Sequence, residues 1–137
     1  MGDSTFLPIS EEEILVRDTP GFTVGYSLTR ENIVWVAYHL TPPELKGTVS
    51  RTEDFRADPE LNGGAGVLED YLGSGFDRGH LAPAGDMKWS AAAMSHSFLL
   101  SNIAPQLRQF NSGIWLDLER ATRSHVLNTQ RSVYLVT

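Results

Sequence analysis

Three short polar segments in the second half of the chain constrain its fold most strongly. They are Asp77-Arg78-Gly79-His80, then Ser101-Asn102, and then a stretch that runs from Phe110-Asn111 to Leu118-Glu119. Their spacing suggests one shared site. The fold must therefore bring an extended segment, a buried turn and a helix face together.

Composition favours one soluble domain. The chain has 137 residues, 41% of them hydrophobic, and no apolar run long enough to span a bilayer, so no membrane partner is expected. The first residues lack the basic and then apolar pattern of a signal peptide. Because there is no cysteine, disulfides, thiolate metal sites and cysteine nucleophiles are excluded, which leaves His, Asp, Glu and Asn as ligands.

Charge is distributed unevenly along the chain. The formal net charge of -6 argues against a protein coated with basic residues. However, residues 1–70 carry five basic and thirteen acidic side chains, whereas residues 71–137 carry six basic and four acidic ones. The half with the polar segments is therefore mildly basic, which suits a polyanionic substrate or reflects a scatter of solvated charges.

The first half of the chain predicts a flexible lead-in, a hairpin and a long excursion. Residues 1–20 are expected to be a partly flexible lead-in, with order beginning near Phe22 and residues 21–137 forming the ordered portion of one domain, which carries the polar segments. Val, Tyr and Trp enrich residues 22–28 and 33–40, which predicts a β-hairpin. Residues 41–76 are rich in Pro, Gly and acids, and predict a surface excursion that either borders a substrate groove or has no role.

The second half predicts two helices and a strand. Ser90 is expected to cap a short helix that ends near Phe98, followed by buried chain around Asn102. Apolar residues at helical spacing predict one helix from about residue 111 to 127. Residues 133–136 read as a strand.

His80 is the best candidate for a general base. A neutral imidazole can take a proton from attacking water. Among the four histidines, His80 is the one that follows Arg and Gly in a segment where backbone can approach a ligand. His39, His96 and His125 are interpreted as packed or surface histidines.

Arg78 lies two residues before His80, so in an extended segment both side chains point to the same side. One face would then carry a base beside a clamp for phosphate oxygens. The alternative is that Arg78 pairs with a neighbouring acid such as Asp77.

Asn111 and Glu119 suit a hydrated magnesium ion. They are eight residues apart and share a side of the predicted helix. Magnesium keeps several waters and often takes one or two protein oxygens, so one asparagine ligand and one glutamate acting through water would suffice. Asn111 near a helix N-terminus would also favour phosphate. The simpler alternatives are an N-cap for Asn111 and an exposed helix position for Glu119.

These segments closely resemble the DNA/RNA non-specific endonuclease family, the endonuclease G type of ββα-metal nucleases. The resemblance lies in residues 76–83 (FDRGHLAP), 101–106 (SNIAPQ) and 110–119, with residues 35–41 also similar, and covers most of the chain from about Tyr26. It implies an α+β fold, with a ββα-metal motif beside a central antiparallel sheet and flanking helices.

The resemblance also implies an activity and a set of roles. The activity is magnesium-dependent hydrolysis of DNA and RNA without sequence specificity, leaving 5′-phosphate ends, with Mn²⁺ as a substitute for Mg²⁺. The implied catalytic residues are the base His80, the phosphate contact Arg78, the orienting residue Asn102 and Glu119, which holds a metal-bound water. Asn111 would bind the metal directly.

The end of the chain departs from the family pattern. Family domains continue past the strand that ends at Thr137, so the chain is expected to lack its C-terminal part, as a fragment or with a second polypeptide supplying the rest. The alternatives are a catalytically weak fragment that binds nucleic acid or a partner protein, and a nuclease domain held by an inhibitor. A homodimer is usual in the family. Relatives are secreted or periplasmic in bacteria and mitochondrial in eukaryotes, and export is preferred here.

Overall fold

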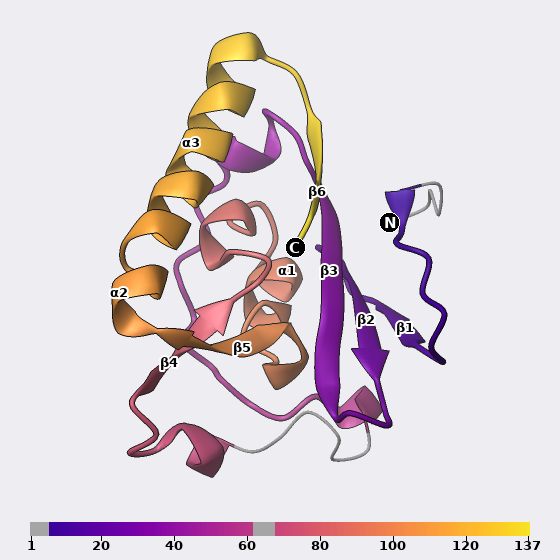
Figure 1. Ribbon diagram of the computed structural model, residues 1–137. Helices are drawn as coiled ribbons and strands as arrows, with labels where there is room; N and C mark the ends of the chain where they lie inside the picture. Colours follow the sequence, from indigo (N-terminus) through magenta and orange to yellow (C-terminus); the bar gives the residue numbers. More distant parts are fainter. Residues whose placement is uncertain (1–5, 62–67) are drawn as a thin grey trace.

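The computed structural model describes residues 6–61 and 68–137 as an α+β fold (Figure 1). A four-stranded antiparallel sheet has the order β1-β2-β3-β6. Its strands are β1 (Leu15–Asp18), β2 (Thr23–Ser27), β3 (Asn32–Leu40) and β6 (Val133–Val136). The hairpin predicted for residues 22–40 is confirmed as β2 and β3, and the C-terminal strand as β6.

A second, two-stranded antiparallel ribbon pairs β4 (Phe76–His80) with β5 (Ile103–Leu107). Three α-helices accompany it: α1 (Ala91–His96), α2 (Arg108–Asn111) and α3 (Ile114–Thr129). Short 3-10 turns lie at Glu44–Lys46, Pro59–Leu61, Leu68–Tyr71, Ala84–Asp86 and Leu100–Asn102. In Figure 1, α3 and the four-stranded sheet lie on opposite sides of the molecule, with the ribbon and α1 between them.

One core fills the space behind the four-stranded sheet. Alternate residues of β2 and β3 are buried on its inner face, as the period of a strand requires. They pack with residues from the following turns, with one residue of α1 and with one of α3: the cluster is Phe22, Val24, Tyr26, Val36, Tyr38, Leu40, Leu61, Ala82, Met87, Ala93 and Val126. The core thereby connects the hairpin to the segments on either side of the ribbon.

The predicted start of order near Phe22 is too late. β1 begins at Leu15 and pairs with β2 from Leu15–Tyr26 to Asp18–Thr23. Arg17 of this strand forms an ion pair with the buried Asp58, with 3.0 Å between Arg17 Nη2 and Asp58 Oδ1. Because a buried carboxylate needs a partner, this contact ties the edge strand to the chain beyond the hairpin.

The excursion predicted for residues 41–76 is anchored at several points. Phe55 packs against the interior, and Asp58 and Leu61 are 2% exposed. Arg56 forms a bridge with Leu99. Residues 62–67, which include most of the predicted glycine-rich part, lie outside the described residues. The rest of this stretch is therefore built into the fold through side chains that its composition did not single out.

The helix predicted for residues 111–127 is confirmed as α3, but Asn111, its predicted first residue, belongs to the separate helix α2. α2 ends at Asn111 and α3 begins at Ile114. Gly113 makes the tight break possible, since a Cβ there would lie 2.3 Å from the carbonyl oxygen of Gln109. Asn111 therefore lies at the C-terminal end of a short helix, and the argument that a helix N-terminus favours phosphate there does not hold.

The apolar stripe predicted on this helix is only partly buried. Val126 is fully buried, but Ile114 and Leu118 are 67% and 56% exposed. The prediction for α1 is confirmed, because the Ser90 side chain accepts a hydrogen bond from the Ala93 N–H at 3.3 Å. Among the described residues, no helix is both long and apolar enough to cross a membrane.

Candidate active site

Four of the five predicted site residues line one cavity of about 350 Å³. Arg78 and His80 come from β4, Asn111 from α2 and Glu119 from α3. The convergence expected from the sequence is therefore present, although Asn111 and Glu119 reach the cavity from two helices instead of one. The other polar lining residues include Arg51 and Arg123.

His80 ends β4 in a tight aromatic surround. Its ring is edge-on to Phe98 and Phe55, with centroids 4.8 and 5.7 Å away. The Trp115 indole N–H donates to the backbone oxygen of His80 at 3.2 Å, which fixes the end of the strand against α3. His80 Nε2 is buried and has no hydrogen-bond partner within the described chain. A buried nitrogen of this kind is suited to a ligand or water.

The pKa of His80 is lowered to about 3. Burial is the main cause, and the positive charges of Arg51 and Arg78 contribute the rest. The imidazole is therefore neutral at physiological pH. A neutral ring has one nitrogen that can accept a proton, which is the form that a general base requires.

Arg78 lies exposed beside His80, as predicted for alternate residues of a strand. Its guanidinium carbon is 4.1 Å from the centroid of the Phe55 ring, a cation–π contact that orients the side chain. Asp77, the alternative partner weighed for Arg78, accepts a hydrogen bond from Asn111. The Arg78 head group faces a cavity where it can meet an anion.

Asn111 donates from Nδ2 to Asp77 Oδ2 at 3.1 Å. This bond uses the amide nitrogen, so the amide oxygen is the atom available to a cation. The alternative that Asn111 caps the long helix is not realised, because Gly113 occupies that position without a side-chain cap.

Glu119 belongs to a chain of polar contacts that begins in the core. The Tyr38 hydroxyl donates to Asp86 Oδ2 at 2.8 Å, and Arg123 Nε donates to Asp86 Oδ1 at 2.6 Å. Arg123 Nη2 then contacts Glu119 Oε2 at 3.3 Å. Burial raises the pKa of Asp86 and of Glu119, and Arg123 opposes the rise in both. The network holds Arg123 and Glu119 in place at the cavity wall.

Asn102 is the predicted site residue that does not reach the cavity. It is fully buried, and its Oδ1 accepts from the Ala82 N–H at 2.8 Å. Its Nδ2 donates to the backbone oxygens of Ala82 and Ser97, each at 2.9 Å. Asn102 therefore clamps the backbone immediately after His80 and acts on the site by positioning it.

Gly79 serves packing within the ribbon. A Cβ at this position would lie 2.1 Å from Cδ of Gln106 on β5. The glycine was interpreted as a place where backbone approaches a ligand, but what approaches it is the buried Gln106 side chain.

The donor set suits a cation that keeps most of its own waters. Over residues 6–61 and 68–137, no group of three or more His, Asp or Glu side chains could hold a metal ion. What the cavity offers is the Asn111 amide oxygen and the Glu119 carboxylate. Magnesium bound through one or two protein oxygens fits this set, with a phosphate supplying further oxygens.

Two charged residues of the cavity, Arg51 and Arg123, were missed by the sequence reasoning. Arg123 is four residues after Glu119 on α3, so the i, i+4 rule for helix ion pairs could have found it. Arg51 lies in the irregular stretch before Phe55, where no periodicity or motif marks it. Together with Arg78 they give the cavity three guanidinium groups.

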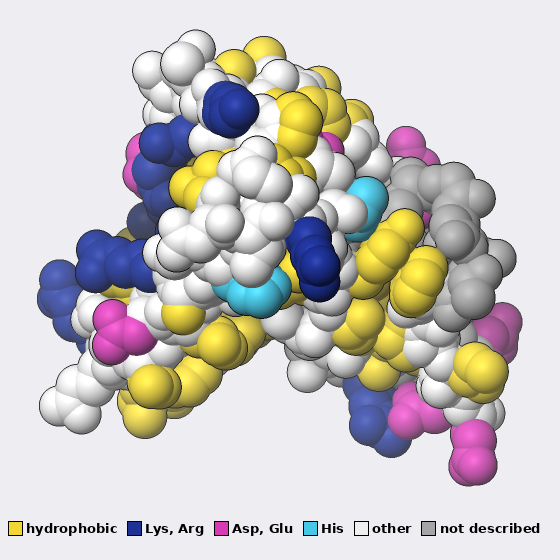
Figure 2. Space-filling view, turned by 90° about the horizontal axis from the view of Figure 1, so that it is seen from above, with side chains coloured by type: hydrophobic (Ala, Val, Ile, Leu, Met, Phe, Trp, Pro, Cys, Tyr) yellow, Lys and Arg dark blue, Asp and Glu magenta, His cyan; other side chains and the backbone are white. Residues whose placement is uncertain are grey.

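Charged side chains are unevenly distributed over the surface. Figure 2 shows Lys and Arg side chains gathered on the left, the side on which α2 and α3 lie in Figure 1, and most of the visible carboxylates on the opposite side. This agrees with the basic balance of residues 71–137 and the acidic balance of residues 1–70. The side of the molecule that carries α2 and α3 is therefore the more positive one.

Comparison with known proteins finds relatives that are named as nucleases. The chain is 37% identical over 124 residues to human mitochondrial endonuclease G, which covers 89% of this chain and 41% of that protein. It is 44% identical over 102 residues to the mitochondrial nuclease EXOG of Danio rerio, covering 73% and 30%. A crystal structure of an EndoG/EndoGI complex superposes with a TM-score of 0.80 at 31% identity, covering 88% of this chain and 51% of that one.

The chain thus spans about half, or less, of the length of the relatives that it matches. The family model for DNA/RNA non-specific endonucleases matches residues 8–137, which is nearly the whole chain. The chain therefore belongs to the DNA/RNA non-specific endonuclease family.

Proposed function

We propose that the chain is a metal-dependent endonuclease that hydrolyses phosphodiester bonds of DNA and RNA without sequence specificity. The observation that carries this proposal is the shared cavity, in which a neutral, buried His80 lies with three arginines, Asn111 and Glu119. Family membership of residues 8–137 supports it independently.

His80 accepts a proton from the water that attacks phosphorus. Burial is the main cause of its low pKa and keeps the imidazole neutral, and a bound phosphate offsets the smaller effect of the positive charges of Arg51 and Arg78, which raises the pKa and makes His80 a better base. The arginines stabilise the extra negative charge that develops on the phosphate oxygens. Asn102 contributes by holding the backbone after His80.

Asn111 would hold magnesium (Mg²⁺) directly and Glu119 would hold it through water, with Mn²⁺ as a substitute. The ion supplies Lewis-acid stabilisation of the phosphate and of the leaving 3′ oxygen, which yields 5′-phosphate and 3′-hydroxyl ends. The Asp77 carboxylate orients the asparagine by accepting from its amide nitrogen.

Lack of sequence specificity follows from what the cavity offers. Its polar groups are guanidinium, amide, imidazole and carboxylate, which address phosphate and metal. Contacts with the backbone carry affinity without direct sequence information, and the backbone charge is common to DNA and RNA.

The alternative is a catalytically weak chain that binds nucleic acid or a partner protein. An inhibitor protein is the partner class suggested by the solved relative, which is complexed with EndoGI. The relatives named mitochondrial favour mitochondria over the export expected from the sequence. A homodimer stays a prediction.

The proposal is tested by incubating the chain with supercoiled plasmid and with RNA, in magnesium and in excess chelator. We expect cleavage of both substrates, which stops with chelator and yields ends that accept a labelled phosphate only after phosphatase treatment. Asn111→Ala should abolish cleavage, whereas the matched change Asn128→Ala on the exposed surface of α3 should not. Metal-independent cleavage, or full activity of Asn111→Ala, would refute these roles. No cleavage by a folded chain would favour the weak-fragment alternative.

A further inference from the structure

A second cavity adjoins the candidate active site. It has a volume of about 380 Å³ and shares Arg51, Arg78 and Asn111 with the first. Its lining also includes the carboxylates of Glu53 and Asp77. One wall carries apolar side chains, among them Phe76 and Leu72, which are 46% and 80% exposed. Exposed apolar side chains next to guanidinium groups are what a nucleotide needs, because its phosphate is anionic and its base presents a flat apolar face.

Strand β4 arranges an aromatic ring, a guanidinium group and the candidate base along one side. Phe76, Arg78 and His80 are alternate residues of one strand, so their side chains share a side and are about 7 Å apart. The exposure of these residues falls along the strand towards the buried His80. A nucleotide whose phosphate lies at Arg78 therefore has its base beside Phe76, on the opposite side from the reacting phosphate at His80.

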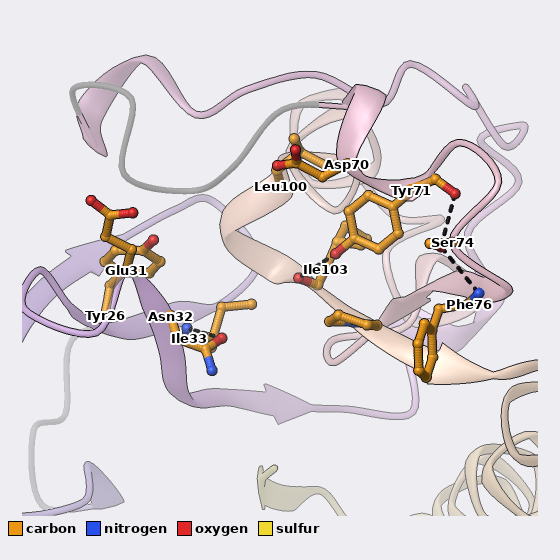
Figure 3. Close-up of a pocket in the computed structure, with 11 residues that line it drawn as sticks. Tyr26, Glu31, Asn32, Ile33, Asp70, Tyr71, Ser74, Phe76, Leu100 and Ile103 are labelled. Carbon is orange, nitrogen blue, oxygen red and sulfur yellow. Dashed lines mark hydrogen bonds between the residues drawn. The ribbon is translucent and has the colours of Figure 1, made fainter.

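The turn that carries the aromatic rings of Tyr71 and Phe76 is held by hydrogen bonds. The Ser74 hydroxyl donates to the Tyr71 backbone oxygen at 2.9 Å and accepts from the Phe76 N–H at 3.1 Å (Figure 3). The Tyr71 hydroxyl contacts the Ile103 backbone oxygen at 3.5 Å. These bonds fix the turn between the two rings, so that a base would meet a prepared surface at low entropic cost.

The same two rings separate this cavity from another one, shown in Figure 3. That cavity has a volume of about 400 Å³, and Glu31 and Asp70 are among its lining residues. Glu31 and Asp70 disfavour phosphate there. In the second cavity Glu53 is paired with Arg51 and Asp77 accepts a hydrogen bond from Asn111, while the guanidinium of Arg78 attracts phosphate. The nucleic-acid backbone is therefore expected to lie along Arg78 in the second cavity. The rings of Tyr71 and Phe76 form the boundary of that cavity, where a base would pack.

We propose that the cavity bounded by Phe76, Tyr71 and Leu72 beside Arg78 is a nucleobase subsite, which takes an unpaired base next to the cleaved phosphate and favours single-stranded substrate. This inference rests on the proposed nuclease function. A base within a duplex must be unstacked and unpaired before it can enter, whereas a single strand offers it freely.

Three variants test the subsite: Phe76→Ala, Phe76→Trp and the matched control Leu107→Ala. Leu107 is the cross-strand partner of Phe76, is 60% exposed and lines none of the three cavities described above. The probe is an oligothymidylate of about ten nucleotides, within the usual size of single-strand sites, with chelator present to prevent cleavage. Phe76→Ala should weaken its binding roughly 5- to 100-fold, the usual range for a stacking aromatic. Leu107→Ala should bind like the parent chain.

Phe76→Trp keeps an aromatic ring at this position and therefore distinguishes loss of stacking from a general disturbance of the fold. It should keep the parent affinity, and its added fluorescence should be quenched on saturation by the stacked base. The subsite is overturned by a parent chain that does not bind the probe, by Phe76→Ala binding like Leu107→Ala, or by unchanged emission from Phe76→Trp.

Cleavage assays separate this proposal from the nuclease proposal. In magnesium, Phe76→Ala should raise KM for single-stranded DNA and change KM for linear duplex little. Equal effects on both substrates, or none on either, overturn the subsite while leaving nuclease function in place. Absence of cleavage by every variant counts against nuclease function, and the binding and fluorescence measurements in chelator still decide the subsite.

Discussion

Burial of a neutral His80 predicts that the chain loses stability in mild acid, and that replacing the histidine removes part of this loss. The pKa of His80 is about 3 in the folded chain, against an ordinary value of 6.5. Below pH 6.5 the unfolded chain therefore binds a proton that the folded chain does not. The part of the folding stability that depends on a neutral His80 is fully present above pH 6.5, and it is lost progressively as the pH falls towards 3.

The magnitude follows from these two values. Each unit of difference corresponds to about 1.36 kcal/mol, so moving from pH 7 to pH 4.5 should cost about 2.5 kcal/mol through His80 alone. This is a large share of the ~5–15 kcal/mol that stabilises a typical domain. Glu119, which lines the same cavity, titrates in parent and variant alike.

The assay is urea unfolding at pH 7 and pH 4.5, followed by tryptophan fluorescence. The parent chain, His80→Gln and the exposed control His125→Gln are compared. Carboxylates titrate in all three, so the difference between chains isolates the histidine. The parent and His125→Gln should lose about 2.5 kcal/mol more than His80→Gln does. An equal loss in the parent and His80→Gln would show that His80 is not held neutral by burial.

Three further substitutions test the site. Asn102→Ala removes three buried hydrogen bonds and should cost about 3 kcal/mol of unfolding free energy in a denaturant titration; a loss below ~1 kcal/mol would contradict the clamp. Arg123→Met leaves the buried Asp86 carboxylate unpaired and should cost ~3–5 kcal/mol by the same titration, so a neutral effect would mean that the network is not needed. Arg78→Ala should lower kcat/KM on plasmid about 10²- to 10³-fold, and a loss no greater than that of the exposed Arg120→Ala would rule out phosphate contact.

Much of the fold could be predicted where local pattern and tertiary structure agree. The hairpin of β2 and β3 follows from alternating Val, Tyr and Trp, and α1 follows from its Ser90 cap. The shared direction of Arg78 and His80 follows from the period of a strand alone. The motif residues themselves identified four of the side chains that line the cavity.

The rest depends on contacts between distant parts of the chain. The break at Gly113 is invisible to helical periodicity, because the apolar spacing continues across it and the steric reason is the carbonyl oxygen of Gln109. Arg51 enters the cavity from an irregular stretch that Phe55 anchors to the interior. The edge strand β1 was missed because its residues are mostly exposed, so that no buried face marks it in the sequence.

The most direct test of the account is the initial rate of magnesium-supported cleavage by His80→Ala, compared with the parent chain and with His125→Ala. Circular dichroism at neutral pH would first establish that both variants fold. The account predicts that His80→Ala loses about 10²- to 10⁴-fold in rate on plasmid and on RNA alike, while His125→Ala keeps the parent rate. Cleavage by a folded His80→Ala at the parent rate would contradict the assignment of the cavity as the catalytic site.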